Sequence, residues 1–188
     1  MKRIVIFASG SGSNAENIIK FFHNRDNASV IQVLTNNPRA KVLDRCKNLK
    51  ISALSFNRVA FYSTDDVLNI LKSAHPDLIV LAGFLWKFPE SILDQFPNKV
   101  INIHPALLPK YGGKGMYGKY VHEAVVQNEE SESGITIHYV NENYDEGAII
   151  FQAKCAVSPS DTPSDVAEKI HDLEMTHFPQ VIDRLLNG

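Results

Sequence analysis

The chain has 188 residues, of which 44% are hydrophobic and 21% are charged, and its formal net charge is −2. This composition is typical of a folded globular domain and excludes a disordered or collagen-like chain. The near-neutral charge argues against a nucleic-acid partner, and no apolar run approaches the roughly 18 residues of a membrane-spanning helix. The apolar N-terminal stretch is too short for a signal peptide, so we expect a cytoplasmic location with Cys46 and Cys155 reduced.

Apolar runs alternate with helical patterns through the first hundred residues. Strands are predicted at residues 4–7, 30–34, 51–56, 77–82 and 99–104, and helices at 14–22, 41–48 and 64–74. Thr64 is a candidate cap for the third of these helices. Strands of continuous apolar residues separated by helices indicate a parallel sheet that is covered on both faces.

The pattern changes after residue 104. Residues 105–118 are rich in turn-forming residues and predict a functional loop. A helix is predicted at 119–128, two paired strands at 134–140 and 148–157, and a last helix at 163–186 with a break near Pro179. The predicted fold is α/β, an open and mainly parallel Rossmann-like sheet with helices on both faces and a mixed or antiparallel far edge. We expect residues 1–188 to form a single domain.

A glycine-rich turn joins the first predicted strand to the first helix, with the sequence SGSGSN at residues 9–14. Glycine lets the backbone turn tightly and approach a ligand, and the free N–H groups at a helix start favour a phosphate. The third glycine of a dinucleotide-binding fingerprint is absent, because Ala15 stands there. From these residues alone, a phosphate or ribose-phosphate site and a plain turn capped by Ser13 or Asn14 are equally well supported.

Asn102, His104 and Pro105 lie at the predicted end of a parallel strand, where the ligands of open α/β sheets bind. Alternation places Asn102 and His104 on the same side of that strand. Asn can donate to a developing oxyanion, and His can supply a proton or a positive charge. The loop at 141–147 could bring Asp145 beside His104, where a carboxylate would raise the imidazole pKa. The alternatives are a structural histidine before a proline turn and a solvated acidic hairpin loop.

Other catalytic motifs are absent from the sequence. None of the seven histidines has the spacing of a zinc-binding motif, so we expect no metal site. The short Gly-Ser-Gly at 10–12 does not fit the nucleophile elbow of a serine hydrolase, and there is no Walker A sequence. The sequence therefore contains no obvious nucleophile for covalent catalysis.

Together these motifs resemble the phosphoribosylglycinamide formyltransferase family, folate-dependent enzymes of purine synthesis. The resemblance covers nearly the whole chain. It depends on the segments SGSGSN at 9–14, PDLIVLAGF at 76–84 and INIHPALLPKY at 101–111, and on Asp145 before Gly147. The pattern Asn-x-His-Pro-x-Leu-Leu-Pro is specific to folate-dependent formyltransferases and related hydrolases.

The resemblance implies a site for two substrates with a catalytic centre between them. Asn102 and His104 would face the formyl group, and Asp145 would adjust the charge of His104. The phosphate and ribose side of glycinamide ribonucleotide would be held by Gly12, Ser13 and Asn14. His171 would be a polar residue on the phosphate side, and Glu174 would be an acid near the substrate amine. The folate would be bound by Leu85, Trp86, Lys87, Phe88, Asn102, His138, Asn141 and Tyr144.

Two segments depart from the family pattern. The family often has an arginine that helps to bind the tail of the folate. In this sequence the matching position falls near Ala60, and Arg58 is a candidate substitute. The loop at 112–119 is longer and richer in glycine than usual, so no family role is carried over to Lys110, Lys114 or His122.

The implied reaction transfers a formyl group from 10-formyltetrahydrofolate, a cosubstrate, to the amine of 5-phosphoribosylglycinamide in de novo purine (IMP) biosynthesis. The neutral amine would attack the formyl carbon directly, and a tetrahedral intermediate would carry the resulting oxyanion. The partners would be these two small molecules, without metal, nucleic acid or membrane. The chain would be a monomer or a homodimer.

Three other functions compete with this one. A methionyl-tRNA or sugar-nucleotide formyltransferase usually carries an additional C-terminal domain, for which we expect no room in 188 residues. A formyltetrahydrofolate hydrolase usually has an N-terminal regulatory domain, whereas this sequence starts at its first predicted strand. A non-catalytic nucleotide-binding module would explain the glycine loop but would leave Asn102, His104 and Asp145 without a shared role.

Overall fold

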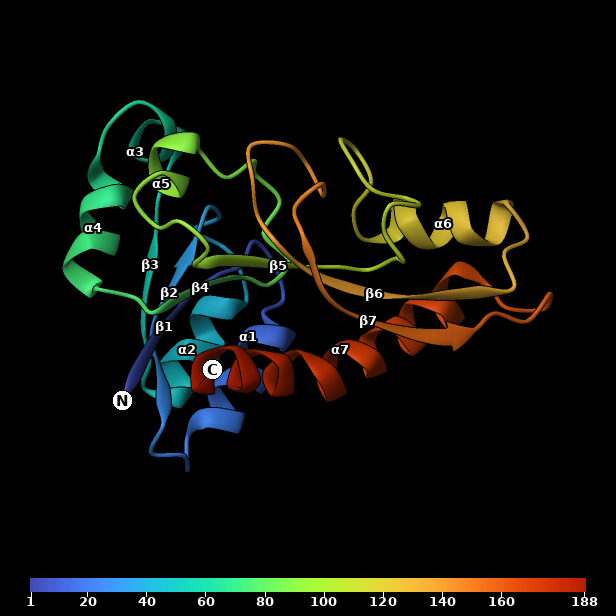
Figure 1. Cartoon of the computed structure of the whole chain (residues 1–188), viewed down its shortest axis with the longest axis horizontal. Coiled ribbons are helices and arrows are strands. Elements are labelled where there is room, and N and C mark those ends of the chain that lie inside the picture. The colour runs from blue at the N-terminus through green and yellow to red at the C-terminus, as the bar shows by residue number, and fades with distance from the viewer.

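The computed structural model describes residues 1–188 and contains one seven-stranded sheet with helices on both faces (Figure 1). The strands are β1 (Lys2–Phe7), β2 (Ala28–Thr35), β3 (Ser52–Ser55), β4 (Leu78–Leu81), β5 (Val100–His104), β6 (Glu132–Tyr139) and β7 (Ile149–Ala156). The helices are α1 (Ser13–Phe22), α2 (Val42–Leu49), α3 (Arg58–Tyr62), α4 (Asp66–Ala74), α5 (Glu90–Leu93), α6 (Lys119–Gln127) and α7 (Pro163–Asn187). No helix combines the length and the apolar character needed to cross a membrane.

The strands lie in the order β3-β2-β1-β4-β5-β6-β7. Strands β1 to β5 pair in parallel, whereas β6 pairs antiparallel with both β5 and β7. The chain first adds strands on one side of β1 and then continues with β4 on the other side, which creates a topological switch point between β1 and β4. Ligands of open α/β sheets bind at such a point, beyond the carboxyl ends of the strands. The predicted fold class, including the antiparallel far edge, is confirmed.

Side chains of the central strands alternate between two apolar cores. In β1, Ile6 belongs to the core shared with α1, α2, α6 and α7, whereas Phe7 belongs to the core shared with α3, α4 and α5. Figure 1 shows α1, α2 and α7 gathered on one side of the sheet and α3, α4 and α5 on the other. The same alternation in β5 turns Asn102 and His104 toward a common side at the carboxyl edge, as predicted.

Most of the predicted elements are present close to their predicted bounds. The short helices α3 and α5, of five and four residues, were not predicted, because so few residues give no measurable periodicity. The predicted cap at Thr64 was wrong. The Thr64 N–H still bonds the carbonyl of Val59 in α3, and the Thr64 hydroxyl donates to the Asp66 carboxylate at 2.7 Å. Helix α4 therefore begins later, after Asp65.

The predicted break at Pro179 was also wrong, because α7 continues through this residue. Proline lacks the N–H that would bond the carbonyl four residues earlier, which belongs to Met175. That carbonyl instead accepts a hydrogen bond from Asn17 Nδ2 of α1 at 2.8 Å. The missing bond inside α7 is thus replaced by a bond between two helices.

Gly147 lets the loop that carries Asp145 rejoin the sheet. A Cβ atom at this position would overlap the carbonyl oxygen of Tyr139 at the end of β6. The Tyr139 N–H donates to the Ala148 carbonyl at 2.9 Å, so the two segments are tied together at the point of contact. The absence of a side chain at position 147 is therefore a packing requirement.

We expect Gly147→Ala to destabilise the fold, because the overlap with Tyr139 must be relieved by separating the two segments. Overpacking of this kind costs about 2 kcal/mol, which lowers the thermal midpoint of a domain this size by about 4–8 °C. Scanning fluorimetry measures this shift. Gly10→Ala is the control, because a Cβ at Gly10 meets nothing within 4 Å. Equal midpoints for the two variants would contradict the packing argument.

Candidate active site

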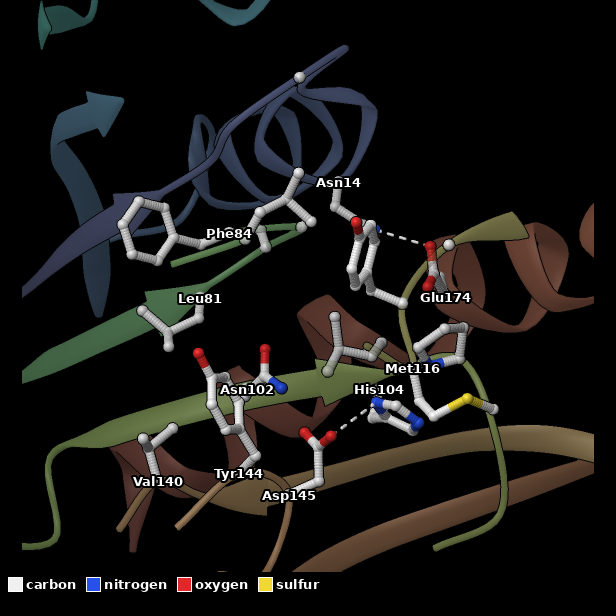
Figure 2. A pocket seen from close by; sticks show the side chains of 18 of the residues that line it. Asn14, Leu81, Phe84, Asn102, His104, Met116, Val140, Tyr144, Asp145 and Glu174 are labelled. Atoms are coloured by element: carbon white, nitrogen blue, oxygen red, sulfur yellow. Dashed lines mark hydrogen bonds and ion pairs between the residues drawn. The ribbon is translucent and has the colours of Figure 1, made fainter. Parts of the chain in front are cut away.

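A cavity of about 620 Å³ lies at the carboxyl edge of the sheet, where β1, β4 and β5 end. The loops that follow these strands line it, together with the β6–β7 loop and part of α7. Figure 2 shows Asn14 and Glu174 facing each other at one end, and Asn102, His104 and Asp145 along the neighbouring wall. The cavity therefore coincides with the switch point of the sheet.

All of the predicted site residues meet in the wall of this cavity. They are Gly12, Ser13, Asn14, Leu85, Trp86, Lys87, Phe88, Asn102, His104, His138, Asn141, Tyr144, Asp145, His171 and Glu174. Residues as far as 160 positions apart in the chain are in direct contact here, as the pair Asn14 and Glu174 illustrates. The fold thus brings together segments whose proximity no sequence spacing could establish.

The start of α1 forms one end of the cavity. Gly12 has a φ of 73°, a left-handed conformation that favours glycine. Neither Ser13 nor Asn14 caps the helix, so its first N–H groups remain available to an anion. Asn14 Nδ2 donates to Glu174 Oε2 at 2.7 Å, whereas the buried Asn14 Oδ1 atom has no partner. This end therefore offers free donors and an unsatisfied acceptor side by side.

Glu174 adds a largely buried carboxyl group to the same end of the cavity. Burial raises its pKa, and the smaller opposing effects of Asn14 and His171 do not cancel this shift. His171 Nδ1 lies 4.0 Å from Glu174 Oε2, and about half of the His171 side chain is exposed. A polar ligand at this end would therefore meet a carboxyl group that water barely reaches.

His104 ends β5 with its ring almost completely buried, and each ring nitrogen faces an acceptor. Nε2 lies 2.7 Å from the Tyr111 carbonyl oxygen, and Nδ1 lies 3.5 Å from Asp145 Oδ2 (Figure 2). Because a carbonyl oxygen can only accept, Nε2 carries the proton of the neutral ring. Nδ1 is therefore the atom that gains or loses a proton beside the carboxylate.

The protonation of His104 is balanced between opposing influences. Burial lowers its pKa, and Asp145 and the Tyr111 carbonyl, which act in the opposite direction, only partly offset this effect. The neighbouring His138 lowers the pKa further. The net effect holds the pKa of His104 below its ordinary value, and negative charge placed nearby would raise it.

Asp145 is held by three neighbours. It accepts a hydrogen bond from the Gly113 N–H at 2.9 Å, and its oxygens lie 3.5 Å from His104 Nδ1 and 3.6 Å from His138 Nε2. Burial alone would raise the pKa of this carboxyl, but His138, His104 and the Gly113 N–H together bring it below its ordinary value. Asp145 therefore stays ionised while shielded from solvent.

His138 also reaches the centre, although the sequence analysis placed it only on the folate side. It pairs with Asn102 across β5 and β6, and its Nε2 atom lies 3.2 Å from Asn102 Nδ2. Nδ1 donates to the Tyr139 carbonyl at 2.9 Å. Nε2 therefore accepts from Asn102 when the ring is neutral and can donate to Asp145 when the ring is protonated. The signal for this role was a histidine next to Ile137 within a predicted strand.

The segment after β4 forms the mouth of the cavity. The Leu85 N–H donates to Ser9 Oγ at 3.0 Å, which ties this segment to the glycine loop. Phe88 is buried in the core, whereas 53% of the Leu85 side chain is exposed. The Arg58 guanidinium lies 5.0 Å from the centre of the Trp86 ring, within the range of a cation–π contact. The mouth thus has an apolar surface, and a cation contacts Trp86 without itself lining the cavity.

Three further groups of the cavity were not assigned from the sequence. The Tyr111 carbonyl and the Gly113 N–H are main-chain atoms, which residue identities cannot reveal. His122 of α6 lines the cavity and is buried, and its Nδ1 atom has no partner. Burial lowers the pKa of His122. The chain has no group of three or more His, Cys, Asp or Glu side chains that could hold a metal ion.

We expect Asp145→Asn to lower the pKa of His104, because the carboxylate 3.5 Å away is a group that raises it. The ring would then stay neutral down to a lower pH than in the unaltered protein. An NMR titration of protein with ¹⁵N-labelled histidine measures this pKa, with the signal assigned by a His104→Gln variant. Glu142→Gln removes an exposed carboxylate from the same loop and should leave the pKa unchanged. A His104 pKa that does not fall in Asp145→Asn would contradict the assignment.

The chain matches the model of the family described as "Formyl transferase" over residues 2–182. A phosphoribosylglycinamide formyltransferase of Haemophilus influenzae is 35% identical over 193 residues, which cover all of this chain and 89% of the relative. A chloroplastic phosphoribosylglycinamide formyltransferase of Arabidopsis thaliana is 34% identical over 187 residues, which cover 96% of this chain. The chain spans 64% of the length of that plant relative.

The fold leads to the same family. The crystal structure of glycinamide ribonucleotide transformylase 1 from Geobacillus kaustophilus superimposes with a TM-score of 0.90 at 32% identity, covering 99% of both chains. A shared fold alone would leave the function open, but here sequence identity and fold agree over nearly the whole chain. The chain belongs to the formyl transferase family, among the phosphoribosylglycinamide formyltransferases.

Proposed function

We propose that the chain transfers the formyl group of 10-formyltetrahydrofolate to the amine of glycinamide ribonucleotide, a step of de novo purine biosynthesis. The observation that carries this proposal is the placement of Asn102, His104 and Asp145 between two different ends of one cavity. A reaction between two unlike substrates needs two unlike binding ends with the reacting groups in the middle. The names of the relatives support formyl transfer and glycinamide ribonucleotide as the acceptor.

The ribonucleotide would occupy the end formed by α1 and α7. The uncapped N–H groups behind Gly12 would bind its phosphate, assisted by Ser13 and Asn14. The free Asn14 Oδ1 atom and the buried Glu174 carboxyl would accept hydrogen bonds from its hydroxyl or amine groups. His171, partly exposed beside Glu174, would serve the phosphate side.

The folate would occupy the mouth. The segment of Leu85, Trp86, Lys87 and Phe88 would line the pterin pocket, and His138, Asn141 and Tyr144 would close it from β6 and the loop that follows. Aromatic and apolar side chains suit a flat heterocycle, because both faces of such a ring can be desolvated. Arg58, stacked on Trp86, would supply positive charge toward the anionic end of the cosubstrate.

The chemistry would take place beside β5. The neutral amine forms a bond to the formyl carbon, and the carbonyl electron pair moves onto the oxygen. The Asn102 amide can donate to this oxyanion, and protonated His104 places a positive charge beside it. Because the oxyanion adds a negative charge near His104, protonation of the ring becomes more favourable as the amine attacks.

The second half of the reaction would release the folate. The oxyanion re-forms the carbonyl group, and the bond between the formyl carbon and the folate N10 atom breaks. The amine loses one proton and N10 gains one, so the reaction needs no net acid or base. Asp145 and His104, 3.5 Å apart, would provide the route for this proton.

The proposal also defines the partners of the chain. 10-Formyltetrahydrofolate acts as a cosubstrate, and the oxyanion is stabilised by Asn102 and His104, so the mechanism requires no metal. The monomeric or homodimeric state, the single domain and the cytoplasmic location stay predictions.

We expect the purified chain to formylate glycinamide ribonucleotide, with the product followed by mass spectrometry and each acceptor offered separately. His104→Ala should lower kcat by about 100-fold or more while both KM values change little, because the ring acts on charge that develops in the transition state. His23→Ala, at an exposed position after α1, is the control and should leave kcat unchanged.

Three outcomes of that assay would contradict the proposal. Preferential formylation of methionyl-tRNA would indicate a different acceptor. Folate hydrolysis that runs as fast without the ribonucleotide as with it would indicate a hydrolase. A normal kcat in His104→Ala would remove this residue from the chemistry.

Asn14→Ala should raise the KM for the ribonucleotide by about tenfold and leave the KM for the folate unchanged, because the amide contacts only the α1 end. Asn17→Ala is a matched control, since Asn17 also bonds α7 from α1 but does not line the cavity. Gly12 is a poorer probe, because a Cβ there would overlap the Val42 side chain. Initial-rate kinetics with each substrate varied in turn would decide. Equal increases in both KM values would move the ribonucleotide to another part of the cavity.

A further inference from the structure

One loop, residues 108–113, contacts both members of the His104–Asp145 pair. The Tyr111 carbonyl oxygen lies 2.7 Å from His104 Nε2, and the Gly113 N–H donates to Asp145 Oδ2 at 2.9 Å. Tyr111 has a φ of 56°, a left-handed conformation that non-glycine residues rarely adopt. The separation of the ring and the carboxylate therefore depends on the conformation of this loop.

The side chain of the same tyrosine anchors the loop outside the cavity. The Tyr111 hydroxyl donates to Glu130 Oε1 at 2.9 Å, and Lys110 Nζ donates to the two Glu130 oxygens at 2.9 and 3.2 Å. Glu130 lies between α6 and β6 and does not line the cavity. Its side chain is 22% exposed, and Lys110 and Tyr111 lower its pKa, so it is ionised. Glu130 thus holds the loop from a place that neither substrate reaches.

Tight packing connects this anchor to the catalytic pair. A Cβ at Gly112 would lie 2.6 Å from Leu108 Cδ2 and 3.3 Å from Asp145 Cβ, so the loop lies directly against the aspartate. The next residue, Gly113, donates its N–H to the Asp145 carboxylate, so the loop is tied to the aspartate by a hydrogen bond as well as by proximity. A displacement of the Tyr111 ring therefore moves the main-chain atoms that contact His104 and Asp145.

We propose that Glu130 is a positioning residue for the His104–Asp145 pair, which it holds through the hydroxyl group and the main chain of Tyr111. The inference rests on the proposed function, because the pair is the catalytic centre of that reaction. Neither Glu130 nor Tyr111 lines the cavity, so we expect loss of the anchor to change the geometry of the centre more than that of either binding end. The expected signature is a change in kcat and in its pH dependence without a change in KM.

The direction of the pH effect follows from the groups that face His104. They are Asp145, His138 and the Tyr111 carbonyl. The carboxylate and the carbonyl raise the pKa of His104, so a loosened loop lowers it. Since protonated His104 supports the transfer, the decline of kcat at high pH moves to a lower pH when the anchor is lost.

The charged groups around Glu130 act only at the surface. Lys110 is its direct partner, and Glu132 lies close enough to influence Lys110. Glu132 itself accepts a hydrogen bond from Lys154 Nζ at 2.8 Å. None of these three residues shifts the pKa of His104. Glu132 is therefore a matched control, a surface glutamate with a lysine partner in the same region but without a contact to Tyr111.

The test compares Glu130→Ala and Tyr111→Phe with the control Glu132→Ala. The first two variants each remove the hydrogen bond between Tyr111 and Glu130, and kcat should fall by about 3- to 10-fold with both KM values within about twofold. Lys110→Met keeps that bond and should stay close to the unaltered protein. Thermal midpoints verify that the variants are folded at the assay temperature.

The pH profile of kcat and an NMR titration of His104 separate positioning from general damage. A profile displaced to lower pH, with a lowered His104 pKa in Tyr111→Phe, supports the inference. A kcat and a profile equal to those of Glu132→Ala would overturn it, as would a lowered kcat with an unmoved profile. If the unaltered chain transfers no formyl group, the proposed function fails. The titration then decides the positioning role alone, since an unchanged His104 pKa in Tyr111→Phe overturns it.

Discussion

The carboxylate of Asp145 is largely buried, because only 11% of this side chain is exposed, and the Asp145 backbone has a φ of 57°. An isolated charge would be costly in such surroundings, and so would the conformation, unless neighbours hold both in place. The compensation comes from two imidazole rings and one main-chain N–H, which belong to β5, β6 and the loop before α6. Three segments are therefore locked around one negative charge, and this charge raises the pKa of His104 against the effect of burial.

The sheet makes this convergence possible. Parallel strands end at a common edge, so the turns after β1, β4 and β5 open into the same space. The antiparallel strand β6 then runs back beside β5 and sets His138 opposite Asn102. Because β6 is antiparallel, it ends beside Ile101 near the start of β5. The loop after β6 therefore returns toward the carboxyl end of β5, where Asp145 reaches His104.

Sequence reasoning was most successful where local patterns decide the structure. Continuous apolar strands predicted the parallel sheet, and strict alternation predicted that Asn102 and His104 share a side. Sequence reasoning failed where the partner of a residue lies far away along the chain. Helix α7 continues through Pro179, and the Met175 carbonyl that this proline leaves free is bonded by Asn17, which lies 158 residues before Met175. The approach of Asp145 to His104 and the role of the Tyr111 carbonyl depend in the same way on tertiary contacts and main-chain atoms, which no residue pattern encodes.

The bond from Asn17 to the Met175 carbonyl has a consequence for how the two proposed substrates would bind. Asn14 bonds the adjacent Glu174, so α1 and α7 are cross-linked at two successive positions within the wall and directly behind it. These helices form a preorganised clamp that needs little ordering when a ligand enters. The mouth, by contrast, exposes Leu85 and Tyr144 on loops. Under the proposed function, the conformational entropy lost by the protein on binding would therefore fall mainly on the folate side, and the ribonucleotide would meet a surface that is already ordered.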